Sequence, residues 1–415
     1  YKRLLPCPST QLGPRIEHLL VKKKGTVLSI VSEVLKLPSE YVADLMSFGA
    51  VHHALRCPKP PLNLTPQQVQ LFKKASPKKW PVLDRVSLVE ARKPERVTDP
   101  NHYAEPGSYI RVHVHPKRFP RCYEVDWRSR IIANEESFVV LNKPAGVSVG
   151  GSVDNVEEIC STFATRALNL EQPLVTTHQL DNCTEGCLLL AKNNEFASRF
   201  HRLLKENKVE KFYLALAAAP VPLGKTAHYM RSDKYPPRIM SNNERLGWQL
   251  CVMHVLECKQ VPWPSEAALS EYQVQPCGWT KSKFAYECRV KLLTGLTHQL
   301  RAQFSALGSP LIGDSLYMPA AAARLENPEL DPFLDTRKKE IADEEAGIEK
   351  SPAESKQLEK KWISLHGSEP LLGIGLQSCE IGWKDEGEVL RFRAGKPWWR
   401  TEEHQEEAAT VPCES

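Results

Sequence analysis

The stretch His178-Gln179-Leu180-Asp181-Asn182-Cys183-Thr184-Glu185-Gly186 is followed at once by the largely apolar run Cys187-Leu188-Leu189-Leu190-Ala191-Lys192. The polar residues around Asp181 and the glycine at 186 predict a tight turn, and the run after them predicts a buried strand. A loop braced by a rigid strand can expose a reactive side chain while the scaffold fixes its position. Asp181 is therefore a candidate catalytic carboxylate, although an isolated aspartate at such a place more often simply caps a turn.

Length and charge set the broad class of protein. At 415 residues, with 41% hydrophobic and 25% charged residues, the chain is long enough for two or three domains with ordinary cores. The net charge of +5 is uneven, because residues 1–130 carry 23 Lys and Arg against 11 Asp and Glu, a net of +12, which leaves −7 for residues 131–415. A basic first third indicates a polyanionic partner, most simply nucleic acid. No apolar run reaches the length of a membrane span, so we expect none.

Twelve cysteines are scattered without the paired spacing of a disulfide framework or a zinc site. We interpret them as free thiols in a reducing compartment and expect no bound metal. A hydrolase that uses His178 and Cys183, directly or through a metal, is an alternative that this spacing does not favour.

The basic first third predicts a small module of two helices and a strand. Apolar residues follow a helical stripe over residues 27–35, and a second helix begins at residues 38–40. Residues 105–107 predict a turn into the alternating strand 108–114. Pro-rich, polar sequence lies between the second helix and this turn, over residues 58–103.

The rest of the chain alternates predicted helices and strands. Asn155, three residues before Glu158, fits a capping box at a helix start, and another helix begins near Asn194. Residues 284–292 alternate between two faces, which predicts a half-buried strand of an antiparallel sheet. Thr297 is the predicted N-cap of the following helix. The expected fold class is α+β, with a mixed, largely antiparallel sheet flanked by helices.

Three motifs in this order resemble those of RluA-type RNA pseudouridine synthases. His178–Gly186 is similar to the family's His-Arg-Leu-Asp-x-x-Thr-Ser-Gly, Lys211–Leu216 to its second motif and Leu293–Arg301 to its third. Ala306–Tyr317 also fits, and the chain most resembles plant organellar members. The resemblance runs from about residue 131 to 317. It implies the pseudouridine-synthase fold, preceded by a small αL-like RNA-binding module. The likeness to that module is interrupted by an insertion of about forty residues, within 58–103, that the module normally lacks.

The resemblance implies that specific uridines in structured RNA are isomerised to pseudouridine. This reaction breaks the carbon–nitrogen bond of a flipped uridine and joins the uracil to the same ribose through carbon, so no cofactor is required. Asp181 is implied as the nucleophile or base, Arg301 as the cation that keeps it ionised, and Tyr213 as the aromatic face under the uracil. The expected substrate-binding set also contains Gln179, His178 and Leu300.

The sequence departs from the family pattern at three positions. Gln179 and Leu296 each stand where the family has an arginine, and Glu185 stands where it has a serine. In the family, the arginine that Gln179 replaces is thought to fill the gap left by the flipped base. A negative charge at 185 would oppose a polyanion unless it faces away. A catalytically weak or inactive RNA-binding or assembly factor on the same fold is therefore the alternative to an active enzyme.

We expect a basic N-terminal region over residues 1–127, a catalytic domain over 128–399 and an acidic tail over 400–415. Residues 321–361 hold 8 Lys and Arg and 11 Asp and Glu, which predicts a partly disordered insertion. The expected partner is rRNA or tRNA, with no membrane, and the expected state is a monomer. Likeness to plant organellar proteins implies the chloroplast, with the mitochondrion as the alternative and a transit peptide removed ahead of Tyr1.

Overall fold

The chain divides into two compact units. A computed structural model describes residues 15–58, 66–67, 69–70, 87–231, 236–274, 279, 282–319, 321, 367–385 and 387–400. The first unit comprises residues 1–124 and 150–163, and the second comprises 125–149 and 164–415. The return of 150–163 to the first unit was not predicted. Apart from Ala321 and Arg400, the predicted insertion and the predicted acidic tail lie outside the described residues.

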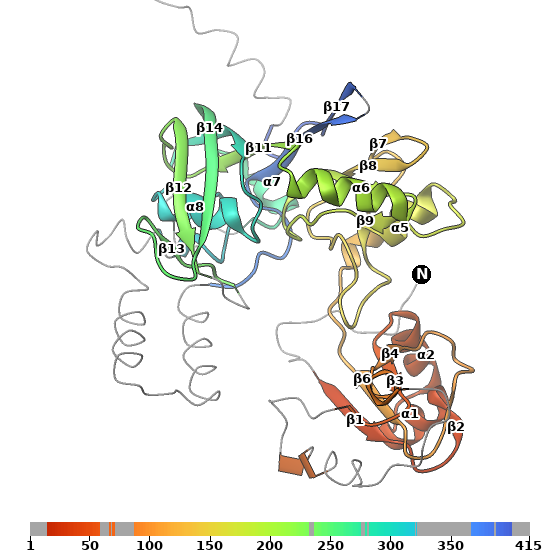
Figure 1. Ribbon diagram of the computed structural model, residues 1–415. Coiled ribbons are helices and arrows are strands. Elements are labelled where there is room, and N and C mark those ends of the chain that lie inside the picture. Colours follow the sequence, from red (N-terminus) through yellow and green to blue (C-terminus); the bar gives the residue numbers. More distant parts are fainter. Residues whose placement is uncertain are drawn as a thin grey trace, which may run out of the picture. The chain divides into compact units, whose positions relative to one another are not determined.

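The first unit contains a four-stranded antiparallel sheet in the order β1-β6-β3-β4, packed against the helices α1 and α2, and a separate two-stranded sheet of β2 and β5 (Figure 1). Its elements are β1 (Ile16–Leu20), β2 (Gly25–Thr26), α1 (Val27–Leu35), α2 (Ser39–Ser47), β3 (Val51–Ala54), α4 (Leu88–Ala91), β4 (Glu95–Arg96), β5 (Tyr103–Ala104), β6 (Tyr109–His113) and the 3-10 helix η1 (Pro120–Tyr123). The two predicted helices are confirmed as α1 and α2, and the strand predicted over residues 108–114 is confirmed as β6. The hydroxyl of Thr26 caps α1 by accepting from the Ser29 amide.

One face of this sheet forms the core of the first unit. Val51, Ile110 and Val112 pack with residues of both helices, including Val31 and Leu45, in a cluster of fully buried side chains. Because side chains alternate along a strand, the residues between these positions lie on the opposite face.

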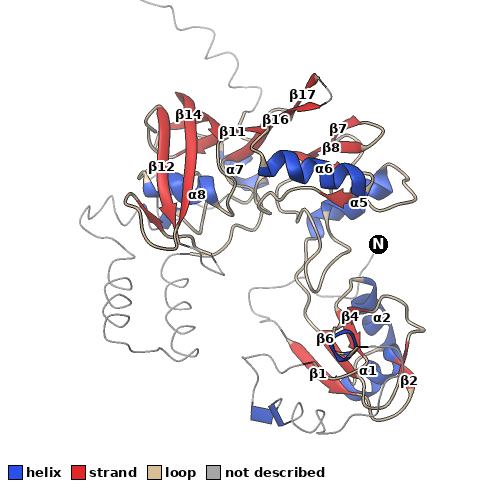
Figure 2. Cartoon of the chain, viewed as in Figure 1, coloured by secondary structure: helices blue, strands red, loops and turns tan. Residues whose placement is uncertain are grey.

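The second unit is built on one eleven-stranded sheet in the order β13-β12-β14-β15-β11-β16-β10-β8-β7, with β17 on β16 and β9 on β10. Its strands are β7 (Ile131–Asn134), β8 (Phe138–Lys143), β9 (Val175–Thr176), β10 (Glu185–Ala191), β11 (Val209–Ala217), β12 (Gly224–Met230), β13 (Met240–Ser241), β14 (Gln249–Pro262), β15 (Phe284–Leu292), β16 (Leu376–Asp385) and β17 (Glu388–Arg393). Its helices are α6 (Asn194–Lys205), α7 (Glu266–Glu271) and α8 (Gln299–Ala306), while α5 (Cys160–Ala167) spans the boundary between the units. Among the described strands, β10 and β16 form the one parallel pair. The predicted α+β class with a mixed, largely antiparallel sheet is confirmed (Figure 2).

The strand β10 lies inside the large sheet, and its apolar run is buried on both faces. It pairs with β8 on one side and with β16 on the other. Phe196 and Phe200 of α6 pack over it, and Asn193 caps that helix by accepting from the Phe196 amide. The helix predicted near residue 194 is thus confirmed, and the loop before β10 is anchored to the middle of the sheet.

Two predicted helix starts are wrong. Asn155 accepts from the amides of Glu157 and Glu158, but the Glu158 carboxylate accepts from Arg118 and from the Asn155 side-chain amide, not from the Asn155 backbone amide as in a capping box. The helix α5 begins only at Cys160. The N-cap of α8 is His298, one residue after the predicted Thr297. It has a φ of 59° and no capping side-chain hydrogen bond. Residues 299–305 of this helix are buried.

Three general features of the described residues bear on function. No helix there is long and apolar enough to cross a membrane. The described cysteines are free, which agrees with the thiol interpretation. In this part of the chain, no group of three or more His, Cys, Asp or Glu side chains could hold a metal ion.

Candidate active site

One pocket of the second unit brings together the residues that the motifs singled out. Its volume is about 540 Å³. Asp181 enters it from the loop before β10, Tyr213 from β11, and Arg301 from α8. The complete predicted set lines this one pocket: Asp181, Tyr213, Arg301, Gln179, His178 and Leu300.

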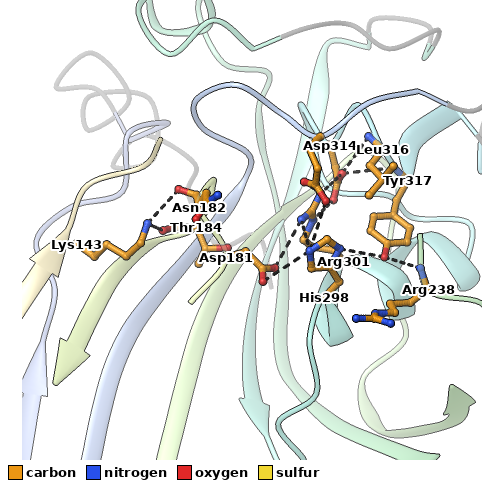
Figure 3. A network of polar contacts seen from close by, with 11 residues as sticks. Lys143, Asp181, Asn182, Thr184, Arg238, His298, Arg301, Asp314, Leu316 and Tyr317 are labelled. Atoms are coloured by element: carbon orange, nitrogen blue, oxygen red, sulfur yellow. Dashed lines mark hydrogen bonds and ion pairs between the residues drawn. The ribbon is translucent and has the colours of Figure 1, made fainter. Parts of the chain in front are cut away.

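A buried lysine, Lys143, holds the Asp181 loop in place through its backbone carbonyls. Nζ of Lys143 donates to the backbone oxygens of Pro144, Asn182 and Thr184 at 3.0, 3.0 and 2.8 Å (Figure 3). Because a buried ammonium is costly unless its protons are bonded, these carbonyls are fixed around it. The Thr184 amide also donates to the Asp181 carbonyl at 3.0 Å, which closes the turn. Lys143 therefore positions the loop rather than the reacting atoms.

The end of the same loop requires a glycine. Gly186 has a φ of 108°, and a Cβ there would lie 2.2 Å from the backbone oxygen of Ser378 on β16. A side chain would therefore clash with the backbone of the parallel partner strand. The loop can approach β16 closely because residue 186 is a glycine.

Arg301 is a fully buried cation surrounded by carboxylates. Its Nη1 lies 3.6 Å from Oδ2 of Asp181, and its Nε and Nη2 bond Asp314 at 2.8 and 3.0 Å. Its Nη2 also bonds Glu369 at 3.0 Å. The two-pronged contact with the fully buried Asp314 fixes the guanidinium plane, so that Nη1 points to Asp181. Figure 3 shows Asp181 facing Arg301, with Asp314 behind it.

His298 joins this network as a neutral imidazole. Nη1 of Arg301 lies 3.2 Å from its Nε2, and because arginine can only donate, Nε2 accepts. The remaining proton is then on Nδ1, which lies 3.2 Å from the Tyr317 hydroxyl. Burial, followed by the charge of Arg301, lowers the pKa of His298 to about 4. The histidine thus orients Arg301 without adding a charge at neutral pH.

The carboxylate of Asp181 is balanced between two opposing influences. Burial raises its pKa above the ordinary value, and the positive charge of Arg301 opposes part of that rise. Its side chain is 21% exposed, so a substrate atom can reach it from the pocket. The arrangement provides a poorly hydrated carboxylate beside a fixed cation, as suits a nucleophile or base.

Tyr213 and two lysines also line the pocket. Tyr213 is buried, and burial together with the charge of Asp181 raises the pKa of its hydroxyl, which therefore stays protonated. Burial lowers the pKa of Lys211, while Lys291 is paired with Glu210 at 2.5 Å. The pocket thus combines an aromatic side chain with ammonium groups that suit a nucleotide.

The remaining predicted site residues occupy different positions. Gln179 is exposed at the pocket, Leu300 is buried at its wall, and His178 is held close to the neutral form because burial lowers its pKa to about 3. Glu185 lies away from the pocket, where its carboxylate accepts from the Trp398 amide and the Gln377 side chain. Burial raises the pKa of Cys183 to about 12, so the thiol is a poor nucleophile.

The motifs missed the residues that hold the site in place. Asp314 and Lys143 lie within stretches that resemble the family, but their spacing gives no sign that one pairs with Arg301 and the other supports the loop. Glu369 follows the charged insertion and has no sequence signal of its own. Buried charges of this kind are recognised by their partners, which only the fold brings together.

Comparison with known proteins agrees with this geometry. A family model for RNA pseudouridylate synthase matches residues 137–306. RNA pseudouridine synthase 6, chloroplastic, of Arabidopsis thaliana is 51% identical over 405 residues, covering 96% of this chain and 84% of that protein. The protein of the same name in Oryza sativa subsp. japonica is 49% identical over 412 residues, with 96% and 83% covered. An uncharacterized RNA pseudouridine synthase of Haemophilus influenzae is 31% identical over 190 residues, which are 45% of this chain and 72% of that protein.

The chain belongs to the RluA-type family of RNA pseudouridine synthases. It is accordingly an isomerase that acts on RNA, and the family and enzyme class predicted from the three motifs are confirmed.

Proposed function

We propose that this enzyme isomerises specific uridines in structured plastid RNA, either rRNA or tRNA, and that Asp181 acts as nucleophile or base on a flipped uridine. Arg301 keeps the carboxylate ionised, and Tyr213 packs against the uracil. Gln179, His178 and Leu300 shape the space around the base.

The convergence of Asp181, Arg301 and Tyr213 on one pocket supports this proposal most directly. These residues come from three motifs far apart in the sequence, yet they line the same cavity. A surface-binding protein would not need a carboxylate buried against a cation, because that arrangement is costly. A pocket of about 540 Å³ can enclose one nucleotide.

The chemistry follows from the charges. Cleavage of the N1–C1′ bond leaves electron density on the uracil and a deficiency on the ribose. An ionised carboxylate can bond to the electron-deficient C1′, or it can relieve the deficiency by removing a proton from the adjacent ribose carbon. The uracil then turns and C5 bonds to C1′ as the bond to the carboxylate breaks or the ribose proton is returned. C5 finally loses its proton and N1 gains one, so the product is an isomer of the substrate. Extruding the base from its stack costs a few kcal/mol, of which stacking on Tyr213 recovers roughly 1–3 kcal/mol.

The test compares two aspartates of the second unit. Plants that lack the protein are complemented with the parent chain, with Asp181→Asn, or with Asp385→Asn, whose aspartate pairs with Arg199 outside the pocket. Pseudouridine is then mapped in organellar RNA by chemical labelling. We expect the sites that disappear without the protein to return with the parent and with Asp385→Asn, but not with Asp181→Asn.

Full restoration by Asp181→Asn would contradict the catalytic role of Asp181. If no site disappeared in plants without the protein, while the purified chain still bound organellar RNA, the binding-factor alternative would be favoured instead. That alternative is supported by Gln179, which lines the pocket. Its side chain is neutral, whereas the family has a positively charged arginine at this position.

The proposed location is the chloroplast, with a monomeric enzyme. The plant relatives in the comparison are both named as chloroplastic. Immunoblots of purified plastids and mitochondria should detect the protein in plastids, and its presence in mitochondria alone would contradict this assignment. Light scattering of the purified chain should give the mass of one chain.

A further inference from the structure

Glu369 is a carboxylate of the second unit that the sequence motifs do not include, and it contacts the two residues that face Asp181. Its Oε2 accepts from Nη2 of Arg301 at 3.0 Å, and its Oε1 lies 3.4 Å from Nε2 of His298. Asp181 approaches the same two side chains, with Oδ2 3.6 Å from Nη1 of Arg301 and Oδ1 3.9 Å from Nε2 of His298 (Figure 3). One guanidinium and one imidazole are therefore shared by two carboxylates.

The backbone around Glu369 is anchored to the turn after α8. Gly367 has a φ of 111°, and an added Cβ there would overlap the backbone oxygen of Ser315. The Ser315 hydroxyl donates to the carbonyl of Ser368 at 2.7 Å. The same turn contains Asp314, the main partner of the buried guanidinium. The segment that carries Glu369 is therefore held beside the carboxylate that fixes this guanidinium.

Glu369 completes the set of acceptors around Arg301. A guanidinium has five N–H groups. The group on Nε and one on Nη2 point to Asp314, the second on Nη2 points to Glu369, and Nη1 faces His298 and Asp181. Because Arg301 is only 1% exposed, loss of Glu369 would leave one buried N–H without an acceptor among the described residues. Glu369 therefore helps to hold the guanidinium in the orientation that faces Asp181.

The charges around Arg301 are unequal in number. Its single positive charge is shared by three carboxylates, those of Asp181, Asp314 and Glu369, while the neutral His298 adds none. Two carboxylates close to one cation oppose each other's ionisation, because like charges repel. The Glu369 side chain is 45% exposed, so solvent screens this repulsion only in part. Glu369 should therefore make Asp181 bind a proton more tightly than it would beside Arg301 and Asp314 alone.

A carboxylate that a cation stabilises strongly is ionised, but it is a weak base and a weak nucleophile. A catalytic base works best when its pKa lies near the working pH. We propose that Glu369 is a positioning residue of the reaction, which limits the positive charge that Arg301 presents to Asp181 and so keeps Asp181 reactive as well as ionised. This role rests on the proposed function, in which Asp181 is the reacting carboxylate. Glu369 acts through Arg301 and makes no contact with the uridine in this role.

Other titratable and charged groups also surround Asp181 and Glu369. Burial raises the pKa of Asp181, the charge of Arg301 lowers it, and the charges of Asp314 and Lys143 then raise and lower it. The groups on the neighbouring elements are Lys143 of β8, Cys183 of the Asp181 loop, Tyr213 of β11, Arg238 before β13, His298 and Arg301 at α8, and Asp314 and Tyr317 of the turn after α8. A substitution at Glu369 alone leaves all of these side chains unchanged.

The first measurement is the pH dependence of kcat/KM on a transcript that contains the mapped uridine. Glu369→Gln keeps an oxygen that accepts from Arg301 but removes the negative charge. Its acid limb should move to lower pH than that of the parent, and its kcat at neutral pH should fall severalfold, because Asp181 becomes a weaker base. Glu369→Ala also removes the acceptor, so its limb should move in the same direction and its kcat should fall further.

The matched control is Glu257→Gln. Glu257 pairs with Lys259 outside the pocket, and its side chain is 47% exposed, close to the exposure of Glu369. This variant removes the same charge from the same unit, and it should keep the kcat and the acid limb of the parent. An equal shift of the limb in Glu257→Gln and Glu369→Gln would reflect the overall charge of the protein and would overturn the proposal.

The second measurement follows Asp181 without turnover. Carbon-13 NMR of the full chain, labelled at the aspartate carboxyl carbons, gives its titration, and the Asp181 signal is identified by its absence from Asp181→Asn. The pKa of Asp181 should be lower in Glu369→Gln than in the parent, and an unchanged or higher pKa would overturn the proposal. The proposal would also fail if Glu369→Gln lowered the unfolding temperature and kcat while the acid limb stayed in place, because Glu369 would then be only structural.

The two readouts separate this proposal from the function on which it rests. Full activity of Asp181→Asn would contradict the catalytic role of Asp181, and the NMR titration would still show whether Glu369 controls its ionisation. An unchanged titration together with an inactive Asp181→Asn would contradict the role of Glu369 alone.

Discussion

The ionisation of Asp181 links function to stability. Its pKa is raised in the folded chain, so the native carboxyl holds a proton more tightly than the unfolded one. Its contribution to stability is therefore greatest below the unfolded pKa and declines as the pH rises through the folded value. At neutral pH the charged form is kept at some cost in folding free energy. Asp181→Asn should thus remain at least as stable as the parent, and a loss of activity would not reflect unfolding.

The pH profile of the enzyme should report the ion pair between Asp181 and Arg301. Activity should fall at low pH as Asp181 becomes protonated. Arg301→Gln removes the charge that lowers this pKa, so the acid limb of kcat/KM should move to higher pH. Rates on a transcript containing the mapped uridine, measured across pH, would show the shift. Arg199→Gln, which removes a partly exposed arginine that pairs with Asp385 outside the pocket, is the control.

An acid limb that stays in place in Arg301→Gln would mean that Arg301 does not control the ionisation of Asp181. The variant also leaves the buried Asp314 without its main partner, so its unfolding temperature must be measured alongside. A folded variant with an unshifted limb would contradict the assigned role of Arg301.

Residue identities were predictable where a motif fixes them, and partners were not. Asp181, Tyr213 and Arg301 were singled out from the sequence, and the structure places all three at one pocket. Their specific roles stay predictions. The bond of Arg301 to Asp314, thirteen residues away, and its contact with Glu369 depend on the tertiary fold. Spacing along the chain carries no information about such contacts.

At the level of elements, the strand β10 and its parallel neighbour β16 position the Asp181 loop. Periodicity predicted β10 and β15 correctly. A long apolar run and a long alternating run are strong signals for a strand, and they outweigh the conformational preferences of single residues. It failed at α8, because the residue before that helix, His298, has a left-handed conformation and contacts Arg301 and Tyr317, and spacing along the chain shows neither feature. The same reasoning explains Asn155, whose turn ends in a buried ion pair instead of a helix.

Gly186→Ala should destabilise the protein by about 3 kcal/mol or more, because it combines a positive φ with a clash against the Ser378 backbone. Gly224→Ala is the matched control, since Gly224 has a φ of 104° but no atom within 4 Å of an added Cβ. Chemical denaturation of both variants isolates the clash. Equal losses of unfolding free energy would show that β10 and β16 do not approach as closely as described. Gly186→Ala should also reduce activity, because it displaces the Asp181 loop.

At the scale of the molecule, the boundary between the basic and acidic parts of the sequence lies close to the boundary between the two hydrophobic cores. The first 130 residues carry the net positive charge, and the first unit has its own buried core. The second unit holds the pocket and separate apolar clusters around α6 and α7. Composition predicted a basic front region, but it could not predict that residues 150–163 return to it. That return depends on contacts such as the buried pair of Arg118 and Glu158.

Because each unit has its own core, calorimetry of the full chain should resolve two unfolding transitions. Leu45→Ala leaves a cavity at a fully buried position of the first unit. It should lower the unfolding free energy of that unit by about 2–5 kcal/mol and so lower the temperature of one transition, while the temperature of the other stays the same. Gly186→Ala should lower the other transition instead. Pseudouridine formation on a short RNA that reaches the pocket should persist in Leu45→Ala at temperatures above its first transition. A single cooperative transition that both variants shift equally would contradict this expectation. It would show that the two units unfold together and that the pocket of the second unit depends on the first unit for its stability.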